Sequence, residues 1–171
     1  VYIVLSIIGA MLVLIGIFVV YTASGTVTIL DPRLVQMSGQ IKTIVSALLM
    51  IGFSVKAGII PFGLVWLPRA HSEAPTPVSA LLSGILVQCA AFAMIRSVAP
   101  IALSEYAISA SILVLGVASA FTGAICATLE LFGVKVPLFG FRSDLKRILA
   151  FSTISEVVII FVIVGVAGQP Q

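Results

Sequence analysis

Five stretches of the sequence are each long and apolar enough to cross a lipid bilayer, and no other feature limits the fold as strongly. They cover residues 1–22, 42–67, 77–95, 107–129 and 145–167, and a helix of about 20 residues crosses the hydrocarbon core. Lipid offers the backbone no hydrogen-bond partners, so a spanning segment is a helix or part of a closed barrel. The alternating pattern of barrel strands is missing. We therefore expect an all-α, polytopic transmembrane helix bundle with about five spans in a cell or inner membrane.

The composition supports this class and excludes others. Only 9% of the residues are charged, against about 25% in soluble domains. The basic residues are dispersed among the spans and form no patch, so nucleic acid is not an expected partner. Cys89 and Cys126 fall within spans and lack metal-binding spacing, so we expect neither a metal nor a cofactor. No nucleophile–base pair or phosphate-binding loop stands out. Because the chain begins with Val1 inside an apolar stretch, we expect an excerpt of a longer polypeptide.

The connections between the spans differ in positive charge. Those after the second and fourth spans hold five basic residues, namely Arg69, Lys135, Arg142, Lys146 and Arg147. The other two hold Arg33, Lys42 and Arg96. The positive-inside rule predicts that the first set faces the cytoplasm. Charged residues at span ends, including Lys146 and Arg147, are expected to be interfacial anchors.

Lys56 lies inside an uncharged apolar stretch, just before a predicted helix break. Pro61 lacks an N–H and clashes with the carbonyl four residues earlier, and Gly58 loosens the same turn. The first half-helix should therefore end near Gly58 and leave carbonyl oxygens beside Lys56, where partial negative charge favours a cation. An ammonium at membrane depth usually faces water or a partner. We interpret Lys56 as a candidate proton carrier; the alternative is a lysine that snorkels to the interface.

Three further residues are candidates for the same path. Glu156 is an intramembrane carboxyl that Ser152 and Thr153 can reach on the same helix face, so it is either a relay group or a neutral, hydrogen-bonded acid. Gln88 can orient water or join helices by hydrogen bonds, but its amide does not titrate. His71 exchanges protons near neutral pH; a solvated loop histidine is the alternative.

Two segments of the chain resemble the hallmarks of one membrane-protein family. The first, residues 56–96, reads KAGIIPFGLVWLPRAHSEAPTPVSALLSGILVQCAAFAMIR, and the second, residues 143–156, reads SDLKRILAFSTISE. They look like the antiporter-like, proton-conducting membrane subunits of respiratory complex I, membrane-bound hydrogenases and multisubunit sodium/proton antiporters. YTASGTVTI, residues 21–29, fits more loosely. WLPRAH together with SALLSG is closer to the hydrogenase-like branch.

The resemblance implies a fold of about fourteen helices with two inverted five-helix repeats, each holding one broken helix. This chain resembles the sixth to tenth helices. Lys56 would match the lysine of the broken seventh helix, and His71 the histidine of the WLPxAH element. The implied mechanism is a relay of protons between lysines and water, driven by charge changes in a redox module or partner subunit.

The chain departs from the family pattern at several places. Gln88 stands where the family commonly has a second lysine, and no histidine follows the pair Pro61–Phe62. The glutamate that partners the lysine would precede Val1. Glu156 stands where the family often has a neutral residue or histidine, and the connection around residues 134–140 is unusually long.

From these observations we expect translocation of protons, with sodium as the alternative ion, by one subunit of a redox-driven complex. Lys56 would be the principal carrier, Gln88 and Glu156 would line or extend the path, and His71 would lie near its mouth. Other membrane subunits and the lipid bilayer are the expected partners. Two alternatives remain open: a secondary cation/proton antiporter subunit without redox coupling, and a non-conducting scaffold subunit, which Gln88 permits.

Overall fold

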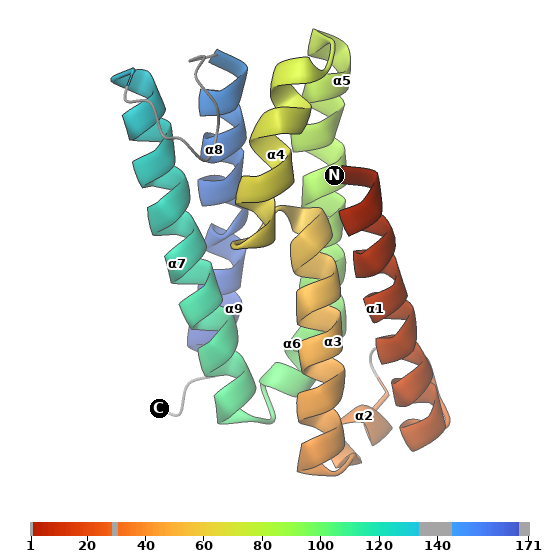
Figure 1. Ribbon diagram of the computed structural model, residues 1–171. Coiled ribbons are helices and arrows are strands. Elements are labelled where there is room, and N and C mark those ends of the chain that lie inside the picture. Colours follow the sequence, from red (N-terminus) through yellow and green to blue (C-terminus); the bar gives the residue numbers. More distant parts are fainter. Residues whose placement is uncertain (1, 29–30, 134–144, 168–171) are drawn as a thin grey trace.

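The computed structural model describes residues 2–28, 31–133 and 145–167, and these residues form a bundle of helices (Figure 1). Along the chain the helices are α1 (Tyr2–Ser24), α2 (Arg33–Gln36), α3 (Gly39–Ala57), α4 (Phe62–Glu73), α5 (Thr76–Leu81), the π-helical segment η1 (Leu82–Val87), α6 (Gln88–Ala102), α7 (Tyr106–Leu131), α8 (Leu145–Val157) and α9 (Ile159–Ala167). No β-strand occurs in these residues.

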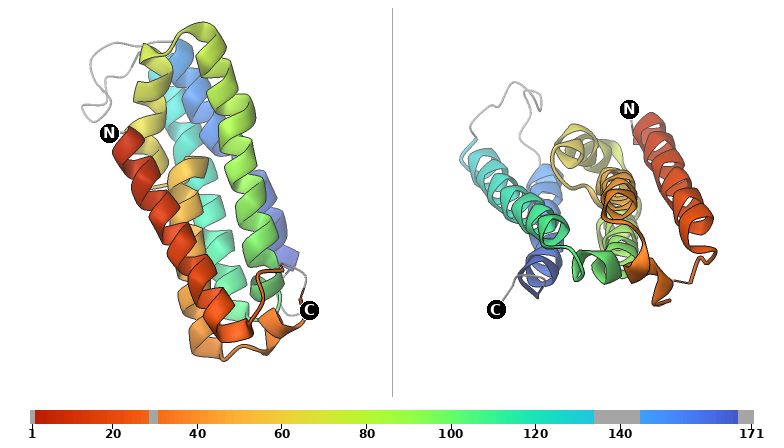
Figure 2. Two further views of the ribbon diagram at one scale, coloured as in Figure 1. Left: turned by 90° about the vertical axis from the view of Figure 1, so that its right-hand side faces the viewer. Right: turned by 90° about the horizontal axis from the view of Figure 1, so that it is seen from below.

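Five units of the bundle are long and apolar enough to cross a membrane. They are α1, α3 with α4, α5 with η1 and α6, α7, and α8 with α9. The prediction of an all-α polytopic bundle with a broken helix is therefore confirmed, and the protein is an integral, multi-pass membrane protein. The units run roughly side by side, with α1 against α3 at one edge and α7 against α8 and α9 at the other (Figures 1 and 2).

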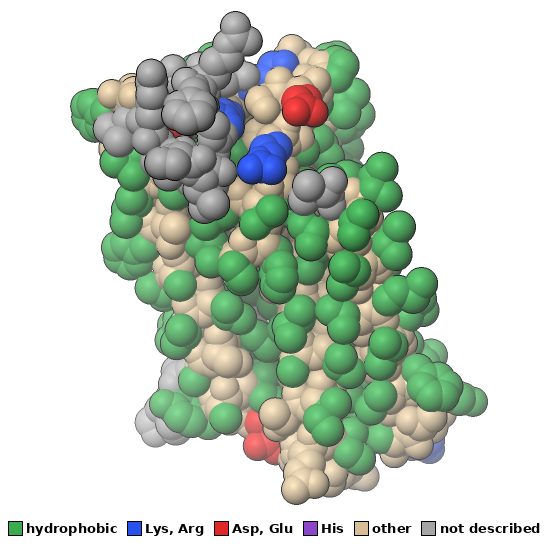
Figure 3. All heavy atoms as spheres, viewed as in Figure 1, with side chains coloured by type: hydrophobic (Ala, Val, Ile, Leu, Met, Phe, Trp, Pro, Cys, Tyr) green, Lys and Arg blue, Asp and Glu red, His purple; other side chains and the backbone are tan. Residues whose placement is uncertain are grey.

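The surface is apolar along the length of the bundle, as a lipid-facing surface requires. Large hydrophobic side chains are exposed on every long helix, and on the face in Figure 3 the charged side chains gather toward the two ends. The interior is packed by apolar residues such as Trp66, Phe151 and Met94, each at most 2% exposed. In a membrane an apolar side chain can lie either in the protein interior or against lipid, so hydrophobicity alone does not determine which helix faces pack together. Small residues determine this.

Glycine sets the contact between α1 and α3. Gly9 and Gly16 are the only buried residues of α1 in the part of the chain that is described. A Cβ on Gly9 would lie 2.8 Å from the carbonyl oxygen of Gly52, and one on Gly52 would lie 2.7 Å from that of Gly9. The two backbones therefore approach as closely as helices linked by small residues do in membranes.

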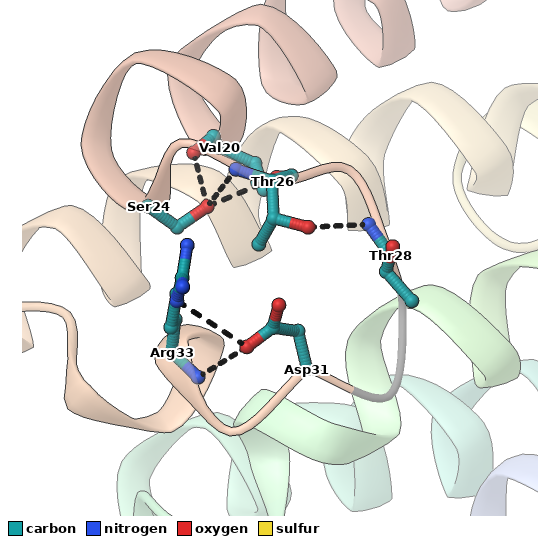
Figure 4. Close-up of polar contacts among 6 residues, drawn as sticks. All are labelled: Val20, Ser24, Thr26, Thr28, Asp31 and Arg33. Carbon is teal, nitrogen blue, oxygen red and sulfur yellow. Dashed lines mark hydrogen bonds and ion pairs between the residues drawn. The ribbon is translucent and has the colours of Figure 1, made fainter.

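The connection from α1 to α2 is held by local hydrogen bonds (Figure 4). Ser24 Oγ donates to the carbonyl oxygen of Val20 at 2.8 Å, and Asp31 Oδ1 accepts from the backbone N–H of Arg33 at 2.9 Å. These contacts close the turn at the end of the bundle where α3 begins.

Some helices differ from the expected ranges. The helix of the third span continues past Arg96, because α6 extends to Ala102 with Pro100 inside its last turn. The same unit contains η1, a π-helical turn, immediately before Gln88. The fifth span is interrupted at Val158, between α8 and α9. The predicted long connection around residues 134–140 lies outside the described residues.

Candidate functional site

The helix break lies where the sequence predicts it, at residues 58–61 between α3 and α4. Gly58 has a φ of 70°, a conformation that favours glycine. Its N–H and that of Ile59 both donate to the carbonyl oxygen of Ser54, which closes the last turn of α3. The Ile60–Pro61 peptide is cis. A Cβ on Gly63 would collide with the Gly58 carbonyl, so the two half-helices meet at close range.

Two long-range contacts fix the break. Trp66, in the first turns of α4, donates its indole N–H to the Val55 carbonyl oxygen at 2.8 Å. The N–H of Ile60 donates to Ser119 Oγ on α7 at 3.2 Å. The expectation of open carbonyls beside Lys56 is therefore wrong for Ser54 and Val55, whose oxygens have donors. The reason is that the Gly58 turn and the indole fold back onto the end of α3.

Lys56 occupies the last turn of α3 and is half-buried. Within the described residues its ammonium makes no hydrogen bond or ion pair. It keeps the partial negative charge that a helix C-terminus provides. Its place at the break is as predicted; its role in proton transfer stays a prediction.

His71 lies inside the protein. It belongs to the last turn of α4 and is 1% exposed, so the alternative of a solvated loop histidine is wrong. The helix continues past the polar residues because Trp66 and Leu67 bury one of its faces. The Nδ1 atom lies 2.5 Å from Ser79 Oγ on α5, and Nε2 has no hydrogen-bond partner among the described residues.

His71 and Glu156, far apart in the sequence, line one pocket. This pocket has a volume of about 290 Å³ and lies between α4, α5 and η1 on one side and α8 on the other. Its polar lining consists of His71, Thr76, Ser79, Ser83, Lys146, Ser152, Thr153 and Glu156. The pocket therefore combines an imidazole, an ammonium and a carboxyl with hydroxyl groups that can hold water.

The pocket runs along α8 from one end of the bundle. Lys146 lies in the first turn of α8 and donates to the Ala74 carbonyl oxygen at 2.8 Å. Glu156 lies ten residues further along α8, about 15 Å at the rise of a helix. From the same end, α4 descends about 17 Å from Glu73 to Phe62. The deepest acid of the pocket and the helix break thus lie at similar depths.

Glu156 itself is exposed and bonded within its helix. Ser152 Oγ donates to Glu156 Oε1 at 2.9 Å, as predicted. Thr153 does not join this contact, because its hydroxyl donates to the Leu149 carbonyl oxygen at 2.8 Å.

Gln88 is not brought to this pocket. It begins α6 directly after the π-helical turn, is half-buried, and is not among the residues that line the pocket. Twelve residues separate it from Thr76, the start of the same unit, which puts it about 18 Å from that end, close to the depth of the break.

Sequence reasoning missed the burial of two basic residues and the place of a third. Arg147 was expected at the interface, but it is 7% exposed and its Nη1 lies 3.6 Å from Glu130 Oε1 on α7. Lys42, 6% exposed, pairs with Glu105 at 3.1 Å. Lys146 was also treated as an anchor; its spacing to Leu149, Thr153 and Glu156, three or four residues at each step, was the signal for one helix face.

No group of three or more His, Cys, Asp or Glu side chains suited to a metal occurs among the described residues. The fold and the site together define a multi-pass membrane protein with charged groups at a broken helix and in a polar pocket.

Comparison with known proteins identifies the family. The family described as "NADH:quinone oxidoreductase/Mrp antiporter, TM" matches residues 1–171. The chain is 35% identical over 159 residues to hydrogenase-4 component B of Escherichia coli, covering 93% of this chain and 22% of that protein. It is 32% identical over 168 residues to the putative antiporter subunit mnhD2 of Staphylococcus saprophyticus, covering 96% and 30%.

A third relative is NADH-quinone oxidoreductase subunit M of Pseudomonas aeruginosa, 30% identical over 158 residues, with 91% of this chain and 28% of that protein covered. The chain therefore spans between about a fifth and a third of the length of these relatives. It belongs to the NADH:quinone oxidoreductase/Mrp antiporter transmembrane family.

Proposed function

We propose that this protein carries protons across a membrane as one subunit of a larger complex, with Lys56 as the group that gains and loses the proton. The observation that carries the proposal is the interrupted helix, which holds a half-buried lysine at the end of α3 without an ion-pair partner among the described residues. A charge at this depth is costly, so its usual explanation is a hydrated or functional site.

The pocket of His71 and Glu156 supports a path from one end of the bundle toward the depth of Lys56. Protons would reach water held by the hydroxyls of this pocket, with His71 and Glu156 as groups that can take and release them. Gln88, at a similar depth on α6, would orient water between this pocket and Lys56 without itself titrating. The family relationship supports ion transport, because relatives carry the names of an antiporter subunit, a hydrogenase component and an oxidoreductase subunit.

We infer the energy source of transport from the names of the same relatives. Two of them are named as parts of redox enzymes, a hydrogenase and a quinone oxidoreductase. We therefore place the redox reaction in a partner subunit. The second candidate is cation/proton exchange without redox coupling, which the likeness to a putative antiporter subunit favours.

The test uses the complete protein in its complex, in sealed membrane vesicles, with proton uptake followed by a pH-sensitive dye. Lys56→Gln removes the titratable group, and we expect the initial rate to fall at least about tenfold, since positioned proton-transfer groups contribute about 10²–10⁴-fold. Lys56→Arg should also fail, because a guanidinium stays charged. Arg96→Gln is the matched control: Arg96 is an exposed cation on a spanning helix, and its loss should leave the rate unchanged.

The energy source separates the candidates. Uptake that requires an electron donor supports redox coupling, and uptake driven by a sodium gradient supports exchange. Wild-type rates in both Lys56 variants, at normal assembly, would contradict the proposal, and a wild-type complex that transports nothing under either condition would identify a scaffold.

A further inference from the structure

A buried ion pair joins the ends of α7 and α8, at the same end of the bundle as the start of the pocket of His71 (Figure 1). Glu130 lies in the last turn of α7 and Arg147 in the first turn of α8. Arg147 Nη1 lies 3.6 Å from Glu130 Oε1, and each residue is 7% exposed. Because both groups are enclosed by protein, salt screens their attraction little.

The signs of these charges oppose the helix dipoles. A helix carries partial positive charge at its N-terminus and partial negative charge at its C-terminus. Glu130 nevertheless stands in the last turn of α7, and Lys146 and Arg147 stand in the first turn of α8. Desolvation adds a further cost for a buried pair. The stability of the two helices therefore does not explain the pair, and such departures from local rules are expected at functional sites.

α7 and α8 pack against each other over the turns that follow the pair (Figure 1). A Cβ on Gly123 of α7 would lie 3.0 Å from the carbonyl oxygen of Phe151 and 3.0 Å from the backbone nitrogen of Ser155, both on α8. Arg147 precedes Phe151 by four residues and therefore lies on the same side of α8. The ion pair thus extends the contact between the two helices to their ends.

Arg147 and its neighbour Lys146 contact different helices. Successive residues of an α-helix are about 100° apart, and Lys146 donates to the Ala74 carbonyl oxygen, directly after α4, at 2.8 Å. The two cations thus hold the first turn of α8 between α4 and α7. A rotation of α8 about its axis would turn the side of Lys146 out of the pocket. On that side lie the other pocket-lining residues of α8, namely Leu149, Ser152, Thr153 and Glu156.

We propose that Glu130 and Arg147 are positioning residues, which fix the rotation of α8 so that its polar side lines the pocket of His71. This inference rests on the proposed function. Neither residue lines the pocket, and neither transfers a proton. By holding Arg147 toward α7, Glu130 keeps the Lys146 ammonium in a fixed place relative to the two groups of the pocket that exchange protons, His71 and Glu156.

The test compares two ion pairs in the complete complex, with proton uptake by vesicles divided by the amount of assembled complex. The double variant Glu130→Leu with Arg147→Met replaces the pair by apolar groups of similar size, a change that buried pairs often tolerate in stability. It leaves the net charge unchanged. Lys42→Met with Glu105→Leu is the matched control, because this pair also joins two helices, at 3.1 Å, but lies at the other end of the bundle.

We expect uptake at least about fivefold lower in the Glu130–Arg147 variant, because displaced proton-transfer groups lose part of a contribution of about 10²–10⁴-fold. The pH of half-maximal uptake should also move by at least about 0.5 units, because the Lys146 charge changes its distance from His71 and Glu156. A pair that only stabilised the fold would change the amount of complex and neither of these quantities. The control variant should match wild type in both.

Two results would overturn the positioning role and leave the proposed function intact. One is a wild-type rate and pH dependence in the Glu130–Arg147 variant while Lys56→Gln abolishes uptake, and the other is an equal change in the control variant. Wild-type uptake in Lys56→Gln would instead overturn the proposed function.

An exchange of the two charges decides the question if the apolar variant fails to assemble. Glu130→Arg with Arg147→Glu allows the ion pair to form again, and each sign now suits its helix end. Because the exchanged pair holds α8 in the same rotation, we expect this variant to restore wild-type uptake. An assembled complex with the exchanged pair and uptake at least about fivefold below wild type would overturn the proposal.

Discussion

At Glu156, one substitution can separate the ability of the side chain to transfer a proton from its role in packing. Its carboxylate accepts a hydrogen bond from Ser152, which a glutamine at this position can also accept. An amide does not take up or release a proton, however, so the substitution removes proton transfer and keeps the hydrogen bond.

We expect Glu156→Gln to lower proton uptake in vesicles about tenfold while the complex assembles normally. Glu73→Gln is the control, because Glu73 is an exposed acid at the end of α4 that does not line the pocket of His71. Equal rates in the two variants would assign Glu156 to packing rather than to transport.

Sequence reasoning located the residues whose interactions are local in the chain. It missed those whose partners lie on another helix. Gly58 and Pro61 act on the turn that contains them, so the break could be predicted from the sequence alone. His71 contacts Ser79 on the next helix, and the pairing of Lys42 with Glu105 joins groups 63 residues apart. No local pattern encodes such distances, and both pairs required the packed bundle.

At the scale of elements, the α3–α4 break depends on one residue with a left-handed backbone conformation. Gly58 has a φ of 70°, at which any Cβ is strained, whereas Gly84 in η1 has open space around the position of a Cβ. An alanine is therefore strained at position 58 and fits without strain at position 84.

We expect Gly58→Ala to lower the free energy of unfolding by about 1–2 kcal/mol, the cost of the left-handed region for a residue with a Cβ. Gly84→Ala should leave it unchanged or raise it by up to about 1 kcal/mol, because alanine favours helical backbone. Unfolding of the purified protein in detergent, followed by circular dichroism, measures both. A loss in the Gly84 variant equal to that at Gly58 would contradict this explanation.

The number of spanning units and their helical nature followed from hydropathy alone, because lipid leaves the backbone no other hydrogen-bonding solution. The details within the units did not. The π-helical turn before Gln88 contains Gly84 but no proline, and neither proline nor glycine stands at the interruption at Val158. The extent of α6 past Arg96 was missed because an exposed cation was taken as the end of a span.

For the whole molecule, the distribution of charge predicts an orientation in the membrane. Arg69, Lys146 and Arg147 lie at the end of the bundle where the pocket of His71 opens, whereas Arg33 and Lys42 lie at the other end. The positive-inside rule then places the pocket on the cytoplasmic side and Glu105 on the opposite side.

This orientation can be measured with single cysteines in a variant that lacks Cys89 and Cys126. A cysteine at exposed Glu73 should react with a membrane-impermeant maleimide only from the cytoplasmic side, and one at exposed Thr28 only from the other. Labelling of both from the same side would exclude five complete crossings, and the reverse pattern would invert the orientation.

The indole of Trp66 has a consequence for how the molecule moves. By donating across the break to Val55, it fastens the two half-helices to each other, while Ser119 fastens the intervening backbone to α7. A change in the angle between α4 and α3 would break both of these hydrogen bonds. The aliphatic part of the Lys56 side chain takes part in neither bond and can change rotamer. Rotamer changes take picoseconds to nanoseconds, far less than the microseconds to milliseconds of helix displacement. The scaffold can therefore stay still while the Lys56 side chain reorients.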